Sequence, residues 1–494
     1  MKLMRTPLLA LVALSASVAA QQSPASYPMP TGSPTSNGLA GFAKILCSAV
    51  FVSGRQPEEA AKNSAYFFMP RGEDADVTWK IDRTAGVVTT TRGEVSRTAK
   101  LHGDQGCIIE NLEKPGIHFK PVPVRTTLPD AATMAWPMGD KPDPSPLPAG
   151  VDRATLDAAL NAAFSDPAAL TQAFLVVHKG RIVAERYAPG VTKDTQLENW
   201  SMGKSLTATL FALLVKDGVY TIDQPAPVPA WRQPGDPRGP IRNRDLLQMS
   251  AGLKFVGNQE PGGGTPQNTV FDHYYIYTGA VDAFEYSITR PVEFPAGTDG
   301  RYRNSDPLTI GYLIKRAVQA KGEEYLTFPQ RRLFDRIGIR RQVLETDPWG
   351  NFLMTGYDYG TARNWARIGM LYLQDGVWNG QRLLPEGWTK FVSTPAPAWR
   401  RAEYGAFFWL NGVGNWTLPP ETYLAAGAGG QNTWIVPGHD LVIVRLGHMR
   451  GQNAARRGTN EALGLVMRAI GSTTPMTQTT PTTPSSEEFG VRPR

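Results

Sequence analysis

The sequence predicts an α+β fold in which one antiparallel sheet is built from both ends of a domain, with a helical region inserted between them. Segments with strand character cluster at 173–187 and again at 404–446. The stretch 205–395 between them has mostly helical patterning with long loops. Short strands at both ends and helices in the middle imply a single sheet flanked by helices. A small N-terminal α+β module precedes this domain.

The N-terminus has the three features of a secretory signal peptide, which we place at residues 1–20. Lys2 and Arg5 give a positive start, 8–18 is apolar, and 18–20 is a small-residue cleavage site. We therefore expect a periplasmic or secreted protein. No cysteine follows the cleavage site, and no other apolar stretch is long enough to span a bilayer, so we expect no membrane anchor.

Composition divides the remainder of the chain into blocks. With 494 residues, 41% of them hydrophobic, the chain can form one large domain and a smaller one. Stretches rich in Pro, Ser, Gly or Thr mark the boundaries. The expected blocks are a linker (21–37), the small N-terminal module (38–122), a Pro-rich linker (123–150), the main domain (151–471) and a disordered tail (472–494).

The individual elements follow from periodicity and turn residues. In the small module we expect a helix at 39–51 and strands at 77–81 and 87–91. The main domain opens with a helix and a hairpin whose turn is Lys179-Gly180. Its expected elements are the helix 153–164, strands 173–178, 181–187, 404–410, 422–426, 433–436 and 441–446, and a final helix at 460–470.

The chain has two cysteines, Cys47 and Cys107, both in the small module. An even number of cysteines in an exported chain favours a disulfide between them, and two buried free thiols are the alternative. Such a bridge closes a loop of about 60 residues and contributes roughly 4 kcal/mol in the chain-entropy model.

Charge and motif content exclude several classes of function. The net charge of +7 is modest for this length, and the basic run 331–341 reads as a solvated helix face, so we expect no nucleic-acid partner. None of the six histidines forms His-Glu-x-x-His and no Cys/His cluster exists, so we expect no metal and no cofactor. A Gly-x-Ser-x-Gly elbow is also absent, since 248–252 lacks the first glycine.

The most informative motif is Ser201-Met202-Gly203-Lys204. A serine hydroxyl needs a group that takes its proton before it becomes a good nucleophile. Residues i and i+3 share one face of a helix, and leucines at helical spacing follow this motif up to Asp217-Gly218. Ser201 would then lie in the first turn, where free N–H groups favour an oxyanion, and burial would lower the pKa of Lys204. A capping serine followed by a surface lysine is the alternative.

In this layout the chain resembles the serine β-lactamase and D,D-peptidase superfamily, in particular its class C-like branch with penicillin-binding esterases and 6-aminohexanoate-dimer hydrolases. The resemblance covers about 150–471 and implies a β-lactamase/transpeptidase-like fold. Its motifs are 200–205 (Trp-Ser-Met-Gly-Lys-Ser), 245–253, Tyr302-Arg303-Asn304, the run 366–380, and Gly429-Gly430.

The resemblance implies roles for individual residues. Lys204 and Tyr302 would share the proton transfers of Ser201, with Lys204 lowering the pKa of the tyrosine, and the pair would titrate together. Asn304 would hydrogen-bond Lys204 and the substrate. The oxyanion hole would consist of the backbone N–H groups of Ser201 and Ala428.

One element of the superfamily pattern is missing. Its usual Lys-Thr-Gly, or His in place of Lys, is replaced here by the apolar run 424–430, whose register the sequence leaves open. The cation commonly binds a substrate carboxylate, so its loss favours an uncharged small-molecule ester or amide. We therefore expect an esterase or 6-aminohexanoate-oligomer hydrolase-like enzyme.

Two other functions remain open: a D,D-carboxypeptidase or β-lactamase, and a catalytically silent binding or sensor protein on the same fold. The aromatic stretch 271–277 fits core packing, with a lid over the cleft as the alternative. The oligomeric state is open.

Overall fold

The computed structural model describes residues 27–257 and 270–472. The predicted signal peptide lies outside the described residues, as do the first part of the linker 21–37 and almost all of the tail 472–494. Among the helices of the described part, none combines the length and the apolar character needed to cross a bilayer.

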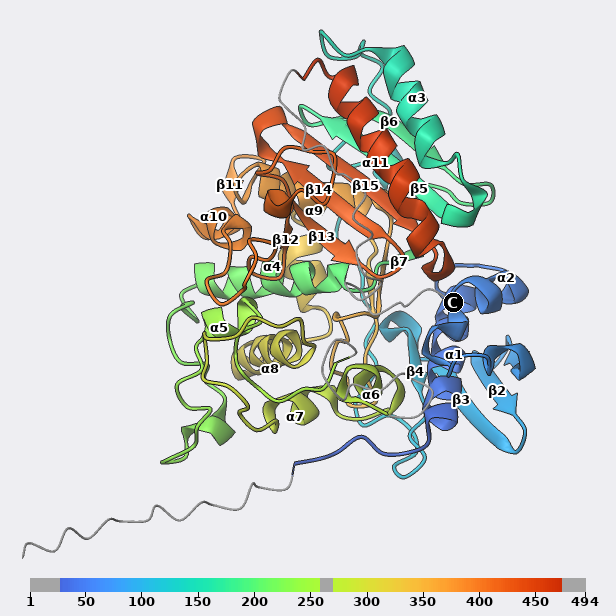
Figure 1. Cartoon of the computed structure of the whole chain (residues 1–494), viewed down its shortest axis with the longest axis vertical. Helices are drawn as coiled ribbons and strands as arrows, with labels where there is room; N and C mark the ends of the chain where they lie inside the picture. Colours follow the sequence, from blue (N-terminus) through green and yellow to red (C-terminus); the bar gives the residue numbers. More distant parts are fainter. Residues whose placement is uncertain (1–26, 258–269, 473–494) are drawn as a thin grey trace, which may run out of the picture.

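A six-stranded antiparallel sheet forms the centre of the main domain, and it is built from both ends of that domain as predicted (Figure 1). The N-terminal hairpin pairs with the last strand, so that Val176 lies opposite Ile443. In spatial order the strands are β12 (Trp409–Leu410), β13 (Tyr423–Gly427), β14 (Gln431–Val436), β15 (Leu441–Gly447), β5 (Thr171–His178) and β6 (Arg181–Tyr187).

Both faces of this sheet are covered by helices, which explains why its central strands are apolar on both sides. Alternate residues of a strand point to opposite faces. Phe174 and Val176 pack with α3 (Arg153–Ala163) and α11 (Gln452–Ala469), which lie side by side in Figure 1. Leu175 and Val177 pack on the other side, in the core that contains α9 (Ala362–Leu373).

The inserted region is helical, as expected, with short strands that the sequence did not indicate. Its first helix, α4 (Met202–Lys216), ends at Asp217 and is followed by Gly218 in the left-handed conformation. The remaining helices are α5 (Asn243–Leu247), α6 (Asp272–Thr278), α7 (Ala283–Ile288), α8 (Ser305–Ala320) and α10 (Trp388–Ser393). The short strands are β7 (Leu197–Glu198), β8 (Val343–Leu344), β9 (Asp358–Gly360), β10 (Val377–Trp378) and β11 (Gln381–Arg382).

Two elements of the main domain have boundaries that differ clearly from the prediction. The strand expected at 404–410 is reduced to β12, because the chain turns tightly before it: Phe407 has φ +56° and the Gly405 N–H donates to the Phe408 carbonyl. The final helix begins at Gln452 rather than at 460. It runs through Gly458, where the chain lies against the Ala162 carbonyl of α3, so this glycine serves close packing and does not end the helix.

The N-terminal segment forms a helical layer on a small antiparallel sheet. The predicted helix begins earlier than expected, because Ser33 caps it from within the presumed linker. Its elements are α1 (Pro34–Phe51), α2 (Pro57–Asn63), β1 (Thr78–Asp82), β2 (Val87–Arg92), β3 (Val95–Leu101) and β4 (Cys107–Ile109), and the strands pair in chain order.

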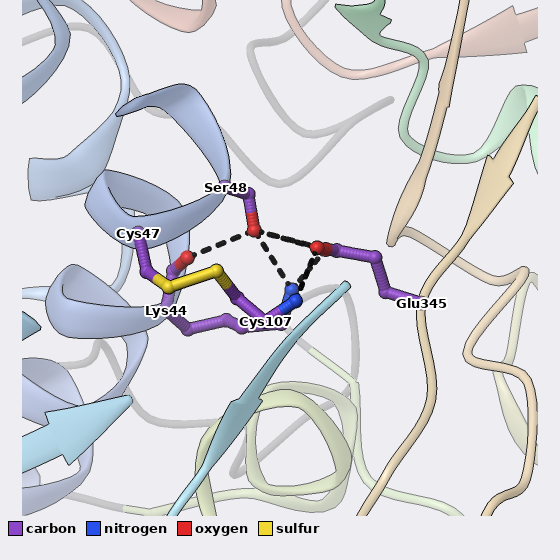
Figure 2. Close-up of a disulfide and its surroundings, with 5 residues drawn as sticks. All are labelled: Lys44, Cys47, Ser48, Cys107 and Glu345. Carbon is purple, nitrogen blue, oxygen red and sulfur yellow. Dashed lines mark hydrogen bonds and ion pairs between the residues drawn. A yellow bond between two sulfur atoms is a disulfide. The ribbon is translucent and has the colours of Figure 1, made fainter. Parts of the chain in front are cut away.

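The predicted disulfide between Cys47 and Cys107 is present and joins α1 to β4 (Figure 2). Beside it, three polar groups of this segment contact Glu345 of the main domain: the Lys44 ammonium, the Ser48 hydroxyl at 2.8 Å and the Cys107 N–H at 2.8 Å. All of these side chains are buried. Buried polar contacts therefore join the N-terminal segment to the main domain.

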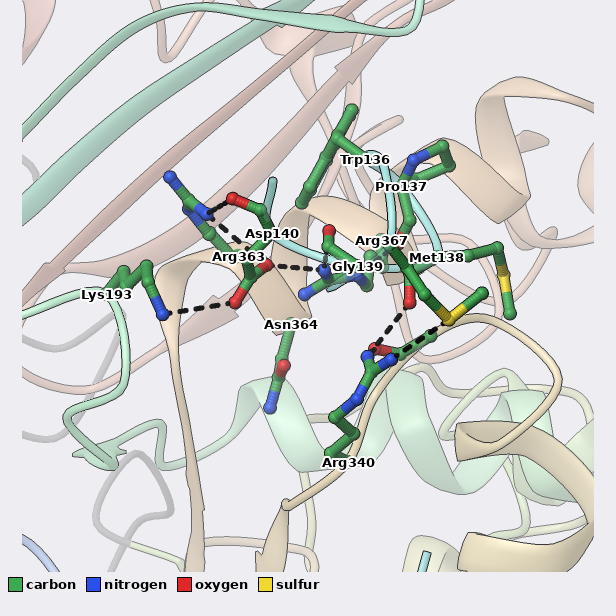
Figure 3. A network of polar contacts seen from close by, with 12 residues as sticks. Trp136, Pro137, Met138, Gly139, Asp140, Lys193, Arg340, Arg363, Asn364 and Arg367 are labelled. Carbon is green, nitrogen blue, oxygen red and sulfur yellow. Dashed lines mark hydrogen bonds and ion pairs between the residues drawn. The ribbon is translucent and has the colours of Figure 1, made fainter. Parts of the chain in front are cut away.

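The Pro-rich stretch 123–150 is also fastened to the main domain (Figure 3). Arg367 of α9 donates to the Pro137 carbonyl at 2.7 Å and to Asp140 at 2.8 Å. Arg340, from the basic run, donates to the Met138 carbonyl at 2.9 Å. The prediction that this run is only a solvated helix face is therefore wrong for Arg340.

Candidate active site

Ser201 and Lys204 meet at the start of α4, as their spacing predicts. Ser201 is the residue that precedes the helix, and the Lys204 Nζ donates to its Oγ at 2.8 Å. Lys204 is fully buried, whereas Ser201 is partly exposed. A buried lysine therefore contacts a hydroxyl that is partly exposed to solvent.

A backbone carbonyl from a distant segment fixes this pair. The Thr355 carbonyl accepts from the Lys204 Nζ at 2.8 Å and from the Ser201 Oγ at 3.3 Å. Gly203 makes this approach possible, since a Cβ at that position would lie 2.0 Å from the Met354 carbonyl oxygen. The glycine inside the Ser-x-x-Lys motif is thus required by the neighbouring segment.

Trp200, directly before the serine, is held in an uncommon backbone conformation. Its φ is +53°, in the left-handed region that costs a non-glycine residue energy. Phe67 and Phe68 of the N-terminal segment pack edge-on against its ring, with centroids 5.0 and 6.0 Å away. The N-terminal segment therefore supports the backbone next to Ser201.

Burial sets the protonation of the lysine. Desolvation lowers the pKa of Lys204 well below its ordinary value of 10.5, and the nearby Asp358 opposes this only in part. Burial likewise raises the pKa of Asp358 well above 3.8, which favours the neutral acid. An uncharged amine at the Ser201 hydroxyl is a proton acceptor.

Tyr302 lies over the same lysine, whose Nζ is 4.8 Å from the centre of its ring. The expected lowering of its pKa by Lys204 is wrong: burial raises the pKa of Tyr302 above its ordinary value, and Ser201 is the only group that opposes the rise. The buried Tyr302 hydroxyl has no hydrogen-bond partner at normal distance in the described part of the chain. Tyr302 is therefore a protonated, unpaired donor beside Ser201.

Asn304 is buried, and in the described residues it makes no hydrogen bond to Lys204, in contrast to the expectation. Its Nδ2 donates to the Tyr277 hydroxyl at 3.1 Å and lies 3.3 Å from His273 Nδ1. Burial is the main cause that lowers the pKa of His273 to about 3, so this imidazole is neutral. The aromatic stretch 271–277 thus supplies buried core residues, as expected, together with two partners for Asn304.

The strand that replaces Lys-Thr-Gly lies directly against the serine backbone. A Cβ on Gly427 would lie 2.2 Å from the Asn199 carbonyl oxygen and 3.0 Å from the Ser201 nitrogen. This contact places Gly427 as the residue of the run 424–430 that lies at the serine backbone. Ala425 belongs to the core on the α4 side of the sheet, so that position carries a methyl group and no cation.

The two expected oxyanion donors, the N–H groups of Ser201 and Ala428, belong to the two segments that meet in this contact. Ala428 comes directly after Gly427, at the end of β13. Neither its N–H nor that of Ser201 donates to another group within the residues that the structure describes. Both donors are therefore available where β13 meets the start of α4.

Three contributors to the site were not predicted: Thr355, Asp358 and His273. β9 pairs with β7, and the Asn199 N–H donates to the Asp358 carbonyl at 3.0 Å, so residues 355–358 lie beside Ser201. No motif marks the short strands that make this contact. In the described residues, no three His, Cys, Asp or Glu side chains gather as a metal site requires.

The fold and this site define a hydrolase with the β-lactamase/transpeptidase-like architecture. Residues 157–467, more than half of the chain, match the Beta-lactamase family, and the chain belongs to that family.

Individual relatives are distant. The 6-aminohexanoate-dimer hydrolase of Paenarthrobacter ureafaciens is 23% identical over 290 residues, which are 56% of this chain and 72% of that protein. A candidate β-lactamase from Bacteroides dorei has a similar structure, with a TM-score of 0.53 and 17% identity over 65% of this chain and all of that one. A penicillin-binding protein homologue from Caulobacter crescentus has a TM-score of 0.48 and 16% identity, over 63% of this chain and 97% of that one. At these identities the structural likeness shows the fold alone.

Proposed function

We propose that the protein is an exported serine hydrolase that cleaves an ester or amide through an acyl-enzyme on Ser201. The observation that carries this proposal is the 2.8 Å contact between the Ser201 hydroxyl and a fully buried lysine of lowered pKa. Neutral Lys204 takes the proton as Ser201 Oγ attacks the carbonyl carbon. The N–H groups of Ser201 and Ala428 receive the negative charge on the carbonyl oxygen.

Tyr302 completes the proton transfers. Because its raised pKa keeps it protonated, it gives its proton to the leaving alcohol or amine when the tetrahedral intermediate collapses, and it regains one from Lys204. In the second half, water attacks the acyl-enzyme, its proton goes to this pair, and Ser201 leaves with a proton. The unpaired Tyr302 hydroxyl supports the donor role.

The substrate class we propose is uncharged near the reacting carbonyl. A carboxylate beside the bond would need a cation, and β13 offers Ala425 at that position. The 6-aminohexanoate-dimer hydrolase among the relatives supports an amide, and the half-buried Trp409 ring stacked on Tyr302 suits an apolar acyl chain. Export is supported by the Cys47–Cys107 disulfide, which requires an oxidising compartment to persist.

Ser201→Ala tests the assignment. Hydrolysis of 4-nitrophenyl butyrate should fall on the order of 10³-fold or more, because the nucleophile is lost. The melting temperature should stay close to that of the wild type, since the hydrogen bonds of Ser201 Oγ in the described residues are those with Lys204 and the Thr355 carbonyl. Ser250→Ala is the matched control, a buried serine whose hydroxyl donates to the Asp245 carbonyl, and it should keep full activity.

Parallel assays separate the alternative functions. Mass spectrometry should find one fluorophosphonate adduct, on Ser201, and linear amides or esters should turn over faster than a chromogenic cephalosporin. Fast cephalosporin hydrolysis would instead identify a β-lactamase. The absence of both adduct and turnover would identify a silent binding protein.

A further inference from the structure

Arg445 carries a buried positive charge that the site described so far does not use. It lies on β15, opposite Asn432 of β14 and Phe174 of β5, and its side chain is fully buried. Burial lowers the pKa of Arg445 to about 9, so the guanidinium remains charged at neutral pH. Within the described residues no carboxylate pairs with it. An unpaired buried charge is costly to a protein, so its retention calls for a reason.

The two Nη atoms of the guanidinium donate to three backbone carbonyls and one hydroxyl, and two of the carbonyls belong to the turn after β13, whereas Nε has no partner in the described residues. Nη1 donates to the Gly429 carbonyl at 2.7 Å and to the Gly430 carbonyl at 3.0 Å. Nη2 donates to the Ala169 carbonyl at 2.6 Å and to Thr171 Oγ1 at 3.1 Å. A Cβ on Gly430 would lie 2.6 Å from Nη1, so the guanidinium sits directly against the turn backbone.

This turn, 428–430, carries the expected oxyanion donor. Gly429 and Gly430 both have left-handed φ angles, +82° and +72°, and the Gly429 N–H donates to Gln452 at 2.7 Å. Arg445 and Gln452 thus fix both carbonyls and one N–H of the two glycines. In the described residues, neither the Ala428 N–H nor the Gly430 N–H has a protein acceptor, and Ala428 is the one that directly follows Gly427, which touches the serine backbone.

We propose that Arg445 is a positioning residue for the oxyanion hole: it fixes the 428–430 turn so that the Ala428 N–H meets the substrate oxygen, and its unpaired positive charge favours the negative charge that develops there. Preorganised donors and charges near a developing oxyanion stabilise the transition state more than the ground state. This inference rests on the proposed function, because it assumes an acyl transfer at Ser201.

The chain contains a matched arginine with a purely structural environment. Arg367 is also buried and also donates to turn carbonyls, those of Pro137 at 2.7 Å and Gly139 at 2.8 Å (Figure 3). It differs in having a carboxylate partner, Asp140, and none of its contacts involves β13 or α4. Arg367→Met therefore controls for the loss of a buried, turn-binding guanidinium.

The test compares a 4-nitrophenyl ester with its thiono analogue, in which sulfur replaces the carbonyl oxygen. Sulfur is a weak hydrogen-bond acceptor and gains little from an oxyanion hole. In the wild type the oxygen ester should react faster. Arg445→Met should lower kcat for the oxygen ester on the order of 10²-fold and change the thiono ester by less than about 3-fold. The ratio of the two rates should therefore fall, while KM stays similar.

Each outcome decides the proposal. Arg367→Met should lower the melting temperature and keep the oxygen-to-sulfur ratio of the wild type. If folded Arg445→Met also keeps that ratio, or loses both reactions equally, Arg445 has only a structural role. Should Arg445→Met not fold, Arg445→Lys, which keeps the charge but not the forked contact, must show a reduced ratio, and an unchanged ratio overturns the proposal. A wild type with neither turnover nor a Ser201 adduct would instead reject the proposed function.

Discussion

At the scale of single residues, the decisive property of the site is that the proposed base, Lys204, is a fully buried lysine. Desolvation opposes the charged form of Lys204, and the neighbouring Asp358 is itself driven toward its neutral acid. Burial raises the pKa of Tyr302, whereas the expectation from the sequence is that Lys204 lowers it. The two groups thereby have separate tasks at neutral pH, since the amine accepts a proton and the phenol donates one.

This separation predicts the pH dependence of the reaction. Protonated Lys204 cannot accept the serine proton, so kcat/KM should fall as the pH drops through the lowered pKa of Lys204, well under 10.5. On the alkaline side the rate should hold past pH 10, because the pKa of Tyr302 is raised and its proton is retained. A pH–rate profile of ester hydrolysis measures both limbs.

Lys204→Arg is the control for this profile, since a guanidinium stays protonated over the whole range. It should lose about 10²- to 10⁴-fold in kcat at every pH. An active Lys204→Arg enzyme with an unchanged profile would assign the acidic limb to another group.

At the scale of elements, the contact between β13 and the start of α4 is the critical one. Gly427→Ala places a methyl group against the Asn199 carbonyl and the Ser201 nitrogen, so the strand must move away from the serine. Loss of one oxyanion donor would then lower kcat about 10²- to 10³-fold. Steady-state kinetics and thermal melting should show a loss of activity far larger than the loss of stability.

Gly464→Ala in α11 is the comparison for that variant. A Cβ there meets Thr417 at an ordinary 3.4 Å, and alanine favours the helix, so stability should be equal or slightly higher and activity normal. If Gly427→Ala matched this behaviour, β13 would not form part of the oxyanion hole.

Local patterns in the sequence predict a large part of these elements. The Ser-x-x-Lys contact needs only one helical turn, and the hairpin 173–187 and the strands after 422 follow from alternation and turn residues. Thr355 and Arg445 could not be found in this way. Thr355 contributes its backbone carbonyl, and no side-chain motif reveals such a contact. In the sequence, Arg445 is one polar residue in an apolar strand, and only the structure shows its contact with the neighbouring turn.

At the scale of the whole molecule, the N-terminal segment packs against the region that holds Ser201 and shares the core of the main domain. Phe67 and Phe68 pack on Trp200, and Lys44 is bonded to Glu345, 301 residues away. Composition marks residues 38–122 as a separate block, yet their core is continuous with that of the main domain. Contacts between distant segments of this kind are not visible in local sequence patterns.

The buried pair gives a quantitative test. Lys44→Met leaves the Glu345 carboxylate buried without its cation and should cost about 3–5 kcal/mol of unfolding free energy. Lys44→Met/Glu345→Gln removes both charges and keeps an acceptor for Ser48 and Cys107, so it should recover at least half of that loss. Urea unfolding of the wild type, both single variants and the double variant measures the coupling, and additive losses would contradict it.

The pairing of β5 with β15 also bears on the order in which the chain becomes active during synthesis. Ser201 and α4 leave the ribosome long before β13, β14 and β15 are made. Until then, the edge of β5 that pairs with β15 remains unpaired. On the proposed mechanism, the oxyanion donor of Ala428 is positioned only once Arg445 has reached it from β15. On this mechanism the growing chain already carries Ser201 and Lys204 but lacks one of its two oxyanion donors, and we expect it to stay inactive until its C-terminal strands have been added.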